Sequence, residues 1–521
     1  MQSKSVLVTG ATGYVGGRLV PLLLDSGYRV TVMGRSMAKL MSRPWARHAH
    51  VTLTKADVFD ADSLKKAARG CWAAFYLVHS MTSRNNNFAE ADRRAARNMA
   101  EASAAAGIQR LIYLGGLGED SPDLSEHLRS RTEVAQILES GPVPVTFLRA
   151  AVILGSGGAS FEMLRYLTER LPIMTTPAWV RTPCQPIAIR NVLGYLKGCL
   201  ENDDTTGRRF DIGGPDVLTY EALIQLYAEE AGLPRRIIIP VKVLSPRLSS
   251  WWVHLVTPVP SSIARPLIDG LRNPVVCKED SIRELIPQEL ISCRQAIRFA
   301  LQRVRQHCVE TCWSDAGAIK IPEWSQCGDA TYAGGTIYEC GYRAVIEASA
   351  QEVWNRIQTI GGQTGWYFAD FLWKVRGAMD RVTGGIGLRR GRRDASQLMV
   401  GDALDFWRVL DMEAPYTLRL LAEMRLPGEA VMEFRVHPLG KGRSELQLLS
   451  RFLPRGLWGM IYWYGLYPFH QWIYSGMLRN LSRAVGKPVS EGPERFAPRR
   501  EHICHIHPRG SSGKQDNEGH F

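Results

Sequence analysis

The sequence predicts a doubly wound α/β domain that is followed by a smaller α+β domain. Through the first 150 residues, short runs of β-branched and aliphatic residues alternate with amphipathic helical stretches. This pattern is typical of a parallel sheet with helices on both faces. Turn-forming residues dominate from Ser314 to Gly335, which indicates a linker. Beyond the linker, successive strands are joined by short turns and end in a long helical stretch, as in an α+β domain.

The individual elements follow from apolar periodicity. The expected parallel strands are Val6–Val8, Arg29–Met33, His50–Lys55, Ala74–Val78, Arg110–Leu114 and Val145–Leu148. The expected helices of this half include Ala89–Ala106, Tyr220–Ala231 and Lys278–Val304. The expected elements of the second half are strands at Ile337–Ile346, Asp402–Leu410, Tyr416–Arg425, Ala430–His437 and Ser444–Phe452, a helix that begins at Ser349, and a helix at Leu457–Val485.

One helix wrapped by an antiparallel sheet is the helix-grip arrangement. We therefore predict a dinucleotide-type α/β domain with a substrate-side elaboration at residues 1–312, a linker at 313–335, a helix-grip domain at 336–489 and a disordered basic tail at 490–521.

Composition narrows the functional classes. The chain has 521 residues, of which 45% are hydrophobic and 22% charged, and its formal net charge is +13. These are the proportions of an ordinary globular protein. We find no nucleic-acid motif, so a nucleotide phosphate, a membrane surface or solubility explains the charge equally well. The cysteines lack paired spacing, so we expect a reduced, cytoplasmic protein. Cys308, Cys312 and the histidines of residues 502–507 lack the second ligand pair of a zinc site, so we expect no metal.

A glycine-rich stretch directly after the first strand predicts a Rossmann-type dinucleotide site. Small residues allow a sharp turn and a close approach to a pyrophosphate at the start of the next helix, whose free N–H groups favour an anion. The residues expected to contact the cofactor here are Thr9, Gly10, Ala11, Thr12, Gly13, Tyr14, Val15 and Gly16.

The end of the second strand favours NADP(H) over NAD(H). An Asp or Glu about 20 residues past the glycines would bind the ribose 2′-hydroxyl of NAD. This chain has Arg35 and Ser36 there, and no acidic residue from Tyr28 through Met41. A guanidinium can hold a 2′-phosphate by charge-assisted hydrogen bonds. The alternative is that Arg35 is a solvent-facing loop residue.

Three later strand ends supply further candidate cofactor contacts. Asp57 and Val58 follow the third strand, His79 and Ser80 end the fourth, and Gly115 and Gly116 end the fifth. The carboxyl ends of parallel strands are where such folds bind ligands. For Asp57 the alternative is a cap on the helix at Ala61–Arg69.

The first 300 residues or so resemble the atypical, NmrA-like members of the short-chain dehydrogenase/reductase superfamily. The resemblance rests on Thr9–Gly16, Asp57-Val58, Pro186-Ile187 and Phe210–Pro215. The second half looks like the START and polyketide-cyclase type of helix-grip domain that is fused to one bacterial subfamily of these reductases. Residues Gly384–Arg393, Gly401–Arg408 and Ala422–Gly428 carry that likeness, which assigns no function to this half.

The chain departs from the family at the catalytic positions. The resemblance implies a Ser after the fifth strand and a Tyr-x-x-x-Lys on the next helix. This chain has Gly115-Gly116 and then His127-x-x-x-Arg131 instead. His127 is a candidate general acid near neutral pH, and Arg131 a candidate ribose or phosphate contact. The alternative for His127 is a polar residue on a helix face.

Two functions are therefore open. The first is an oxidoreductase that transfers hydride from NADPH to an apolar carbonyl or quinone-type acceptor, since hydride transfer needs only the cofactor and an oriented acceptor. The second is an NADP(H)-binding sensor or assembly protein without turnover.

Partners of the second domain are equally open. Its aromatic residues could line a cavity for a small apolar or aromatic ligand, or could simply form a core. The candidate wall residues are Trp366, Tyr367, Phe368, Phe371, Trp373, Phe406 and Trp407. Leu457–Leu478 carries no charge, so membrane attachment is an alternative to its role as the closing helix. The sequence assigns neither the substrate nor the oligomeric state.

Overall fold

The computed structural model describes residues 4–78, 88–118, 126–241, 269–270, 273–306, 309–312, 337–382, 385–389, 392–440 and 442–496. The predicted linker, His79, Ser80 and the metal-like residues Cys308 and 502–507 lie outside these ranges.

A seven-stranded parallel sheet forms the centre of the N-terminal half, so the predicted doubly wound fold is confirmed. Its strand order is β11-β6-β5-β4-β1-β2-β3. The strands are β1 (Ser5–Val8), β2 (Arg29–Gly34), β3 (Val51–Lys55), β4 (Ala73–Tyr76), β5 (Arg110–Gly116), β6 (Val145–Ala150) and β11 (Arg209–Ile212). The strand order reverses between β1 and β4, and ligands bind at such a switch point.

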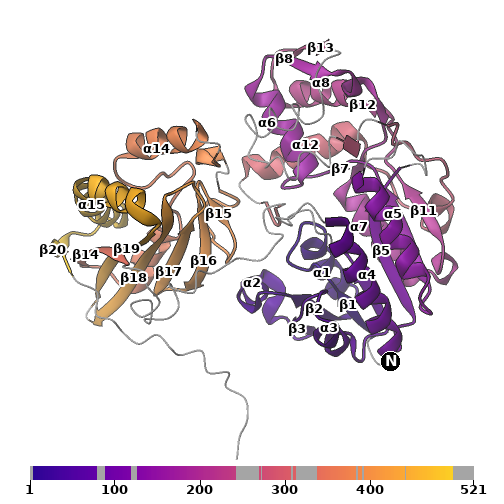
Figure 1. Ribbon diagram of the computed structural model, residues 1–521, viewed down its shortest axis with the longest axis horizontal. Helices are drawn as coiled ribbons and strands as arrows, with labels where there is room; N and C mark the ends of the chain where they lie inside the picture. Colours follow the sequence, from indigo (N-terminus) through magenta and orange to yellow (C-terminus); the bar gives the residue numbers. More distant parts are fainter. Residues whose placement is uncertain are drawn as a thin grey trace, which may run out of the picture. The chain divides into compact units, whose positions relative to one another are not determined.

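Helices cover both faces of this sheet (Figure 1). α1 (Gly16–Asp25) and α7 (Ile189–Glu201) pack with Val6 and Val8 of β1 in one core. α3 (Ala61–Ala68), α4 (Phe88–Ala105) and α5 (Glu126–Glu139) pack with Leu7 in the other. Successive side chains of a strand point to opposite faces, which explains why neighbours in β1 enter different cores.

The substrate-side elaboration has its own smaller core. It contains α6 (Ala159–Arg170), α8 (Tyr220–Ala231), α12 (Cys293–Arg305) and the short strand pairs β7 (Ile153–Leu154) with β10 (Ile187–Ala188), β8 (Ile173–Pro177) with β13 (Ile237–Val241), and β9 (Pro183–Cys184) with β12 (Leu218–Thr219). The single helix predicted at Lys278–Val304 is wrong. α11 (Ile282–Leu285) ends before Pro287, and α12 restarts at a Ser292/Gln295 capping box.

The C-terminal half forms a separate antiparallel sheet domain, again as predicted. Its strand order is β15-β16-β17-β18-β19-β14-β20. The strands are β14 (Tyr338–Ile346), β15 (Ala403–Leu404), β16 (Trp407–Glu413), β17 (Thr417–Ala422), β18 (Gly428–Gly440), β19 (Arg443–Pro454) and β20 (Val489–Arg495). The helices are α13 (Ala350–Ile357), α14 (Asp370–Val382) and α15 (Gly456–Val485). The expected capping box is present, since Ser349 and Glu352 exchange hydrogen bonds.

The predicted disordered tail begins too early. Residues 490–495 belong to β20, which pairs with β14. Their polar composition is that of a tail, but Glu494 forms an ion pair with Arg343 of β14 and the backbone adds an edge strand. By compactness the chain divides into Met1–Ile319 with Trp354–Arg425, and Lys320–Val353 with Leu426–Phe521. The other domain boundaries stay predictions.

Candidate functional site

The turn between β1 and α1 requires glycine for steric reasons. Gly10 has a φ of +66°, and a Cβ added there would lie 2.6 Å from the carbonyl oxygen of Leu77. A Cβ on Gly16 would lie 2.4 Å from the carbonyl oxygen of Gly10. The N–H of Gly13 donates to that same oxygen at 2.8 Å, which closes the turn. The backbone of this loop is therefore exposed to close approach by a ligand, as a pyrophosphate site requires.

The N-terminus of α1 has the properties of an anion site. No side chain caps it, and its first turn contains no acidic residue. Its N–H groups and the positive end of its dipole favour a phosphate. The Thr9 hydroxyl fixes the start of the loop. It donates to the carbonyl oxygen of Phe75 at 2.9 Å and accepts from the N–H of Leu77 at 3.0 Å. Thr9 thereby joins β1 to β4 at the switch point.

Tyr14 anchors the loop to the segment at residues 155–158. A Cβ on Gly155 would lie 2.5 Å from the Tyr14 hydroxyl oxygen, and one on Gly158 would lie 3.0 Å from its Cζ. The Arg18 guanidinium lies 4.9 Å from the centre of the ring. Burial raises the pKa of the Tyr14 phenol above its usual range. Tyr14 therefore stays neutral and acts as a packing residue.

Two arginines, Arg35 and Arg43, lie in the segment of chain that follows β2. Arg35 is exposed directly after β2, and Ser36 caps the short helix α2 (Met37–Met41) by accepting from the N–H of Lys39 at 3.3 Å. Arg43 is only 5% exposed and donates through Nη2 to the carbonyl oxygen of Thr12 at 3.0 Å. Sequence reasoning missed Arg43. The four-residue spacing of Arg35, Lys39 and Arg43 is the signal that could have found it.

Asp57 and Val58 lie just past the end of β3. The Asp57 carboxylate accepts from the N–H of Phe59 at 3.1 Å, whereas Asp60 caps α3. The alternative that Asp57 is the helix cap is therefore wrong, because the cap lies three residues further on. Val58 is buried, and its carbonyl oxygen accepts from Asn98 at 2.8 Å. Their contact with the cofactor stays a prediction.

Gly115 and Gly116 end β5, where packing requires them. A Cβ on Gly116 would lie 2.6 Å from Leu128 of α5, and one on Gly115 would lie 2.7 Å from the Phe147 ring. The absence of side chains at these two positions thus allows Leu128 of α5 and Phe147 of β6 to pack close to the end of β5.

The predicted catalytic residues His127 and Arg131 both lie on α5, one turn apart. Arg131 forms an ion pair with Asp92 of α4 at 3.5 Å, and both side chains are buried. The Ser130 hydroxyl lies 3.3 Å from the same carboxylate. The charge of Arg131 is therefore already compensated within the protein. Its position on this helix is as expected, and its catalytic role stays a prediction.

Two of the three segments that carried the family resemblance beyond the glycine loop, Pro186-Ile187 and Phe210–Pro215, meet in space. The N–H of Gly214 donates to the carbonyl oxygen of Pro186 at 2.9 Å, and a Cβ on Gly214 would lie 2.4 Å from that oxygen. Gln185 donates to the carbonyl oxygen of Gly214 at 2.8 Å. Asp211 pairs with Arg149 at 2.6 Å and accepts from the N–H of Lys278 at 3.0 Å. These contacts join segments of the protein to one another, so they account for these residues by packing of the fold.

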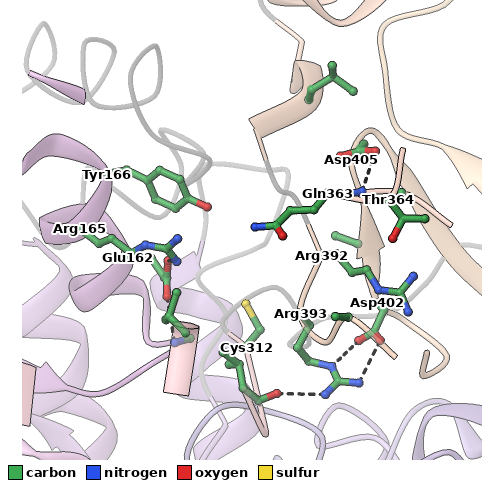
Figure 2. Close-up of a pocket in the computed structure, with 18 of the residues that line it drawn as sticks. Glu162, Arg165, Tyr166, Cys312, Gln363, Thr364, Arg392, Arg393, Asp402 and Asp405 are labelled. Atoms are coloured by element: carbon green, nitrogen blue, oxygen red, sulfur yellow. Dashed lines mark hydrogen bonds and ion pairs between the residues drawn. The ribbon is translucent and has the colours of Figure 1, made fainter. Parts of the chain in front are cut away.

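Residues 361–405 contain buried carboxylates that sequence reasoning did not single out. Asp405 has a φ of 54°, unusual for a residue with a side chain. One of its oxygens accepts from Trp366 Nε1 at 3.0 Å. The same oxygen accepts from the N–H of Gly362 at 3.3 Å, the contact drawn at Asp405 in Figure 2. Burial raises the pKa of this carboxyl. Figure 2 also shows Arg393 paired with Asp402 through two hydrogen bonds, of 2.9 and 3.1 Å.

The aromatic residues near Asp405 pack largely on one another. The rings of Trp366 and Trp373 stack with centroids 5.1 Å apart, and Phe406 and Trp407 lie within the same cluster. All four are buried, whereas Phe371 is exposed. Core packing accounts for these four side chains, and a ligand beside them stays a prediction.

Comparisons with known protein families agree with the division of the chain into a parallel-sheet half and an antiparallel-sheet half. Residues 10–162 match a family model described as NAD(P)H-binding, and residues 332–477 match one described as a protein of unknown function, DUF2867. Each model covers less than half of the chain.

Two curated relatives each match about half of the chain. The chain is 25% identical over 303 residues to subunit 9 of the NADH dehydrogenase (ubiquinone) 1 alpha subcomplex of Arabidopsis thaliana, which covers 56% of this chain and 72% of that protein. It is 25% identical over 238 residues to a (4-alkanoyl-5-oxo-2,5-dihydrofuran-3-yl)methyl phosphate reductase of Streptomyces griseus, covering 44% and 75%.

Among solved structures, the triphenylmethane reductase of Citrobacter sp. in complex with NADP(H) is 19% identical, with a TM-score of 0.47, and covers 57% of this chain and 99% of that one. The matched regions and the observed sheets lead to one conclusion. The N-terminal half combines a Rossmann-type parallel sheet with a match to an NAD(P)H-binding family model, and the C-terminal half combines an antiparallel sheet with a match to DUF2867.

Proposed function

We propose that this protein is an oxidoreductase that transfers hydride from NADPH to an apolar carbonyl or quinone-type acceptor, without the Ser, Tyr and Lys set that the family resemblance implies. The observation that carries the proposal is the uncapped start of α1 beside the glycine loop, with Arg35 between β2 and α2, and Arg43 after α2, where it donates to Thr12 of the loop. Relatives named as reductases support the same class of reaction.

Each part of the site has a separate task in this proposal. The loop from Thr9 to Gly16 holds the pyrophosphate, and Arg35 with Ser36 holds the 2′-phosphate. Asp57 and Val58 border the adenine. Bound NADPH supplies the hydride, and the chain orients the acceptor at the ends of β4 and β5. His127 is the proposed proton donor, because an imidazole can give up a proton near neutral pH.

The choice between NADPH and NADH tests the proposal most directly. We expect the protein to bind NADPH more tightly than NADH in a fluorescence titration. The Arg35→Ala variant should lose about 10- to 100-fold in NADPH affinity, because about 1.5–3 kcal/mol of charge-assisted hydrogen bonding is removed. Its NADH affinity should not change.

Arg29→Ala is the matched control, because Arg29 is exposed at the opposite end of the same strand. It should leave both affinities as they are. Equal binding of the two cofactors by the unmodified protein, or an equal loss in both variants, would contradict the assignment of the 2′-phosphate to Arg35.

A second candidate function is NADP(H) binding without turnover, in a sensor or an assembly protein. Two observations favour it: the pairing of Arg131 with Asp92, and a relative that is named as a subunit of a larger complex. The oxidation of NADPH can be followed by its absorbance with a panel of quinones and apolar carbonyls. If the protein binds NADPH and oxidises it with none of them, this second function holds and the first fails.

Two further expectations stay proposals. We propose a small apolar or aromatic ligand for a helix-grip domain in the C-terminal half, supported by the antiparallel sheet with α15 against it and by the left-handed Asp405 beside the aromatic cluster. We also propose the cytoplasm as the compartment, from the cysteine pattern.

A further inference from the structure

The long helix α15 has two apolar faces, of which its own domain covers only one. Trp463, Tyr474, Met477 and Leu481 are buried on the first face. This face packs on β14, β19 and β20 (Figure 1). A helix on the surface of a sheet normally presents polar residues on its other side.

The opposite side of the amino-terminal half of α15 is instead apolar and exposed. The exposed fraction is 69% for Leu457, 76% for Trp458 and 62% for Tyr464, and about half for three further residues. The exposed residues Leu457, Trp458, Ile461, Tyr464, Phe469 and Trp472 are called the aromatic face below. Neighbours within the set are mostly three or four positions apart, so they form one stripe, roughly 24 Å long at about 1.5 Å per residue.

We propose that the aromatic face of α15 binds the surface of an anionic lipid bilayer, with the helix lying parallel to the membrane plane. Trp and Tyr are the side chains that favour the boundary between lipid tails and headgroups. The helix contains no Asp or Glu between Gly456 and Val485, while Arg455 precedes it and Arg479 and Arg483 are exposed near its end. The charge that attracts anionic headgroups thus lies beyond the carboxyl end of the stripe, whereas Arg455 at the other end pairs with Glu429 at 2.9 Å.

The structure favours a helix that lies on the membrane over one that crosses it. No helix in the described part of the chain is long and apolar enough to span a bilayer. One side of α15 is also held against its own sheet, and leaving the sheet would expose the buried face. Only the exposed stripe is available to lipid.

A second copy of the chain is the less favoured occupant of this face. In a two-fold symmetric dimer, the same face of both helices meets itself. Arg479 and Arg483 of one helix would then lie near Arg455 of the other, whose charge Glu429 already compensates, and α15 itself offers no carboxylate for Arg479 and Arg483. An anionic surface compensates these two arginines.

The test is sedimentation of the full-length protein with lipid vesicles. We expect the protein to sediment with vesicles that contain phosphatidylglycerol, and much less with vesicles of phosphatidylcholine alone. The double variant Trp458→Glu, Tyr464→Glu should lower the bound fraction at least about tenfold, because it places two charges in the apolar stripe. Arg479→Gln with Arg483→Gln should reduce binding to the anionic vesicles and reduce its salt dependence.

The matched control is Met379→Glu with Val382→Glu on α14. These two residues are similarly exposed and receive the same charge change on another helix. The control should bind vesicles like the unmodified protein, and far-ultraviolet circular dichroism should show that all variants are folded. Failure to bind any vesicle, or an equal loss in the control, overturns the proposal. The proposal is also overturned if the protein binds no vesicles and forms a dimer that Trp458→Glu dissociates. In that case a second copy of the chain occupies the aromatic face.

Discussion

The two sheets of this protein bury their side chains in different ways. In the parallel sheet, all four residues of β4 are buried, because helices pack on both faces. In the antiparallel sheet, the first residues of β19 alternate between buried and partly exposed. Parallel sheets are covered on both sides, whereas antiparallel sheets can face water on one. Ligand chemistry in the first domain is therefore confined to the strand ends, where backbone geometry is decisive.

The same contrast extends to the polar groups. Around the parallel sheet, the constrained positions are glycines such as Gly10 and Gly16, which leave the backbone accessible. Beside the antiparallel sheet, the constrained positions are buried carboxylates. Asp402 and Asp405 flank the short strand β15, and each accepts several hydrogen bonds. The cited constraints beside the parallel sheet are therefore steric and concern the backbone of the glycine loop. Those beside the antiparallel sheet are electrostatic and concern two buried carboxylates.

Loss of the Asp402 carboxylate should have the largest effect on stability. Asp402→Ala leaves the Arg393 guanidinium buried without its ion-pair partner, which should cost about 3–5 kcal/mol in the free energy of unfolding. Urea denaturation measures it. Glu139→Ala is the control, because Glu139 also pairs with an arginine through two bonds, but that arginine, Arg209, is 41% exposed. It should cost about 1 kcal/mol. Equal costs would mean that burial does not distinguish the two pairs.

Gly10→Ala should have the next largest effect on stability, and it should also weaken NADPH binding. The left-handed backbone costs an alanine about 1–2 kcal/mol, and the contact with Leu77 adds about 1–3 kcal/mol. Gly27→Ala is matched, since Gly27 also has a positive φ but nothing within 4 Å of an added Cβ. It should show the backbone cost alone and unchanged NADPH binding. If the two variants behaved alike, close approach in the loop would not matter.

The smallest expected effect is a pH dependence at Asp405. Burial raises the pKa of this carboxyl in the folded state above its unfolded value. The folded protein therefore holds the proton more tightly, so its stability falls as the pH rises from the unfolded to the folded pKa. Asp405→Asn removes this titration. The melting temperature of the variant, relative to the unmodified protein, should be higher at neutral pH than at acid pH. A difference independent of pH would contradict the raised pKa.

Much of the fold could be predicted from the sequence. The strands Val6–Val8 and Arg29–Met33 were placed to within a residue, because each is a short apolar run between clear turn signals. The helix at Tyr220–Ala231 was placed with its observed bounds. One failure was the helix expected at Lys278–Val304, which is interrupted near Pro287, and the other was a polar segment. Residues 490–495 were predicted to be part of a tail, because an exposed edge strand needs no apolar pattern. Their strand forms by backbone pairing with β14, which is distant in the sequence.

The candidate site divides in the same way. The sequence alone determined the glycine loop and Arg35, since a tight turn and a strand end place adjacent residues together in any protein of this pattern. Only the tertiary structure decided what lies beside them. Arg43 donates to Thr12, Asp92 pairs with Arg131, and Asp405 accepts from Trp366, across 31, 39 and 39 positions of the chain. Local spacing carries no information about such contacts, because they form only when separate elements pack together.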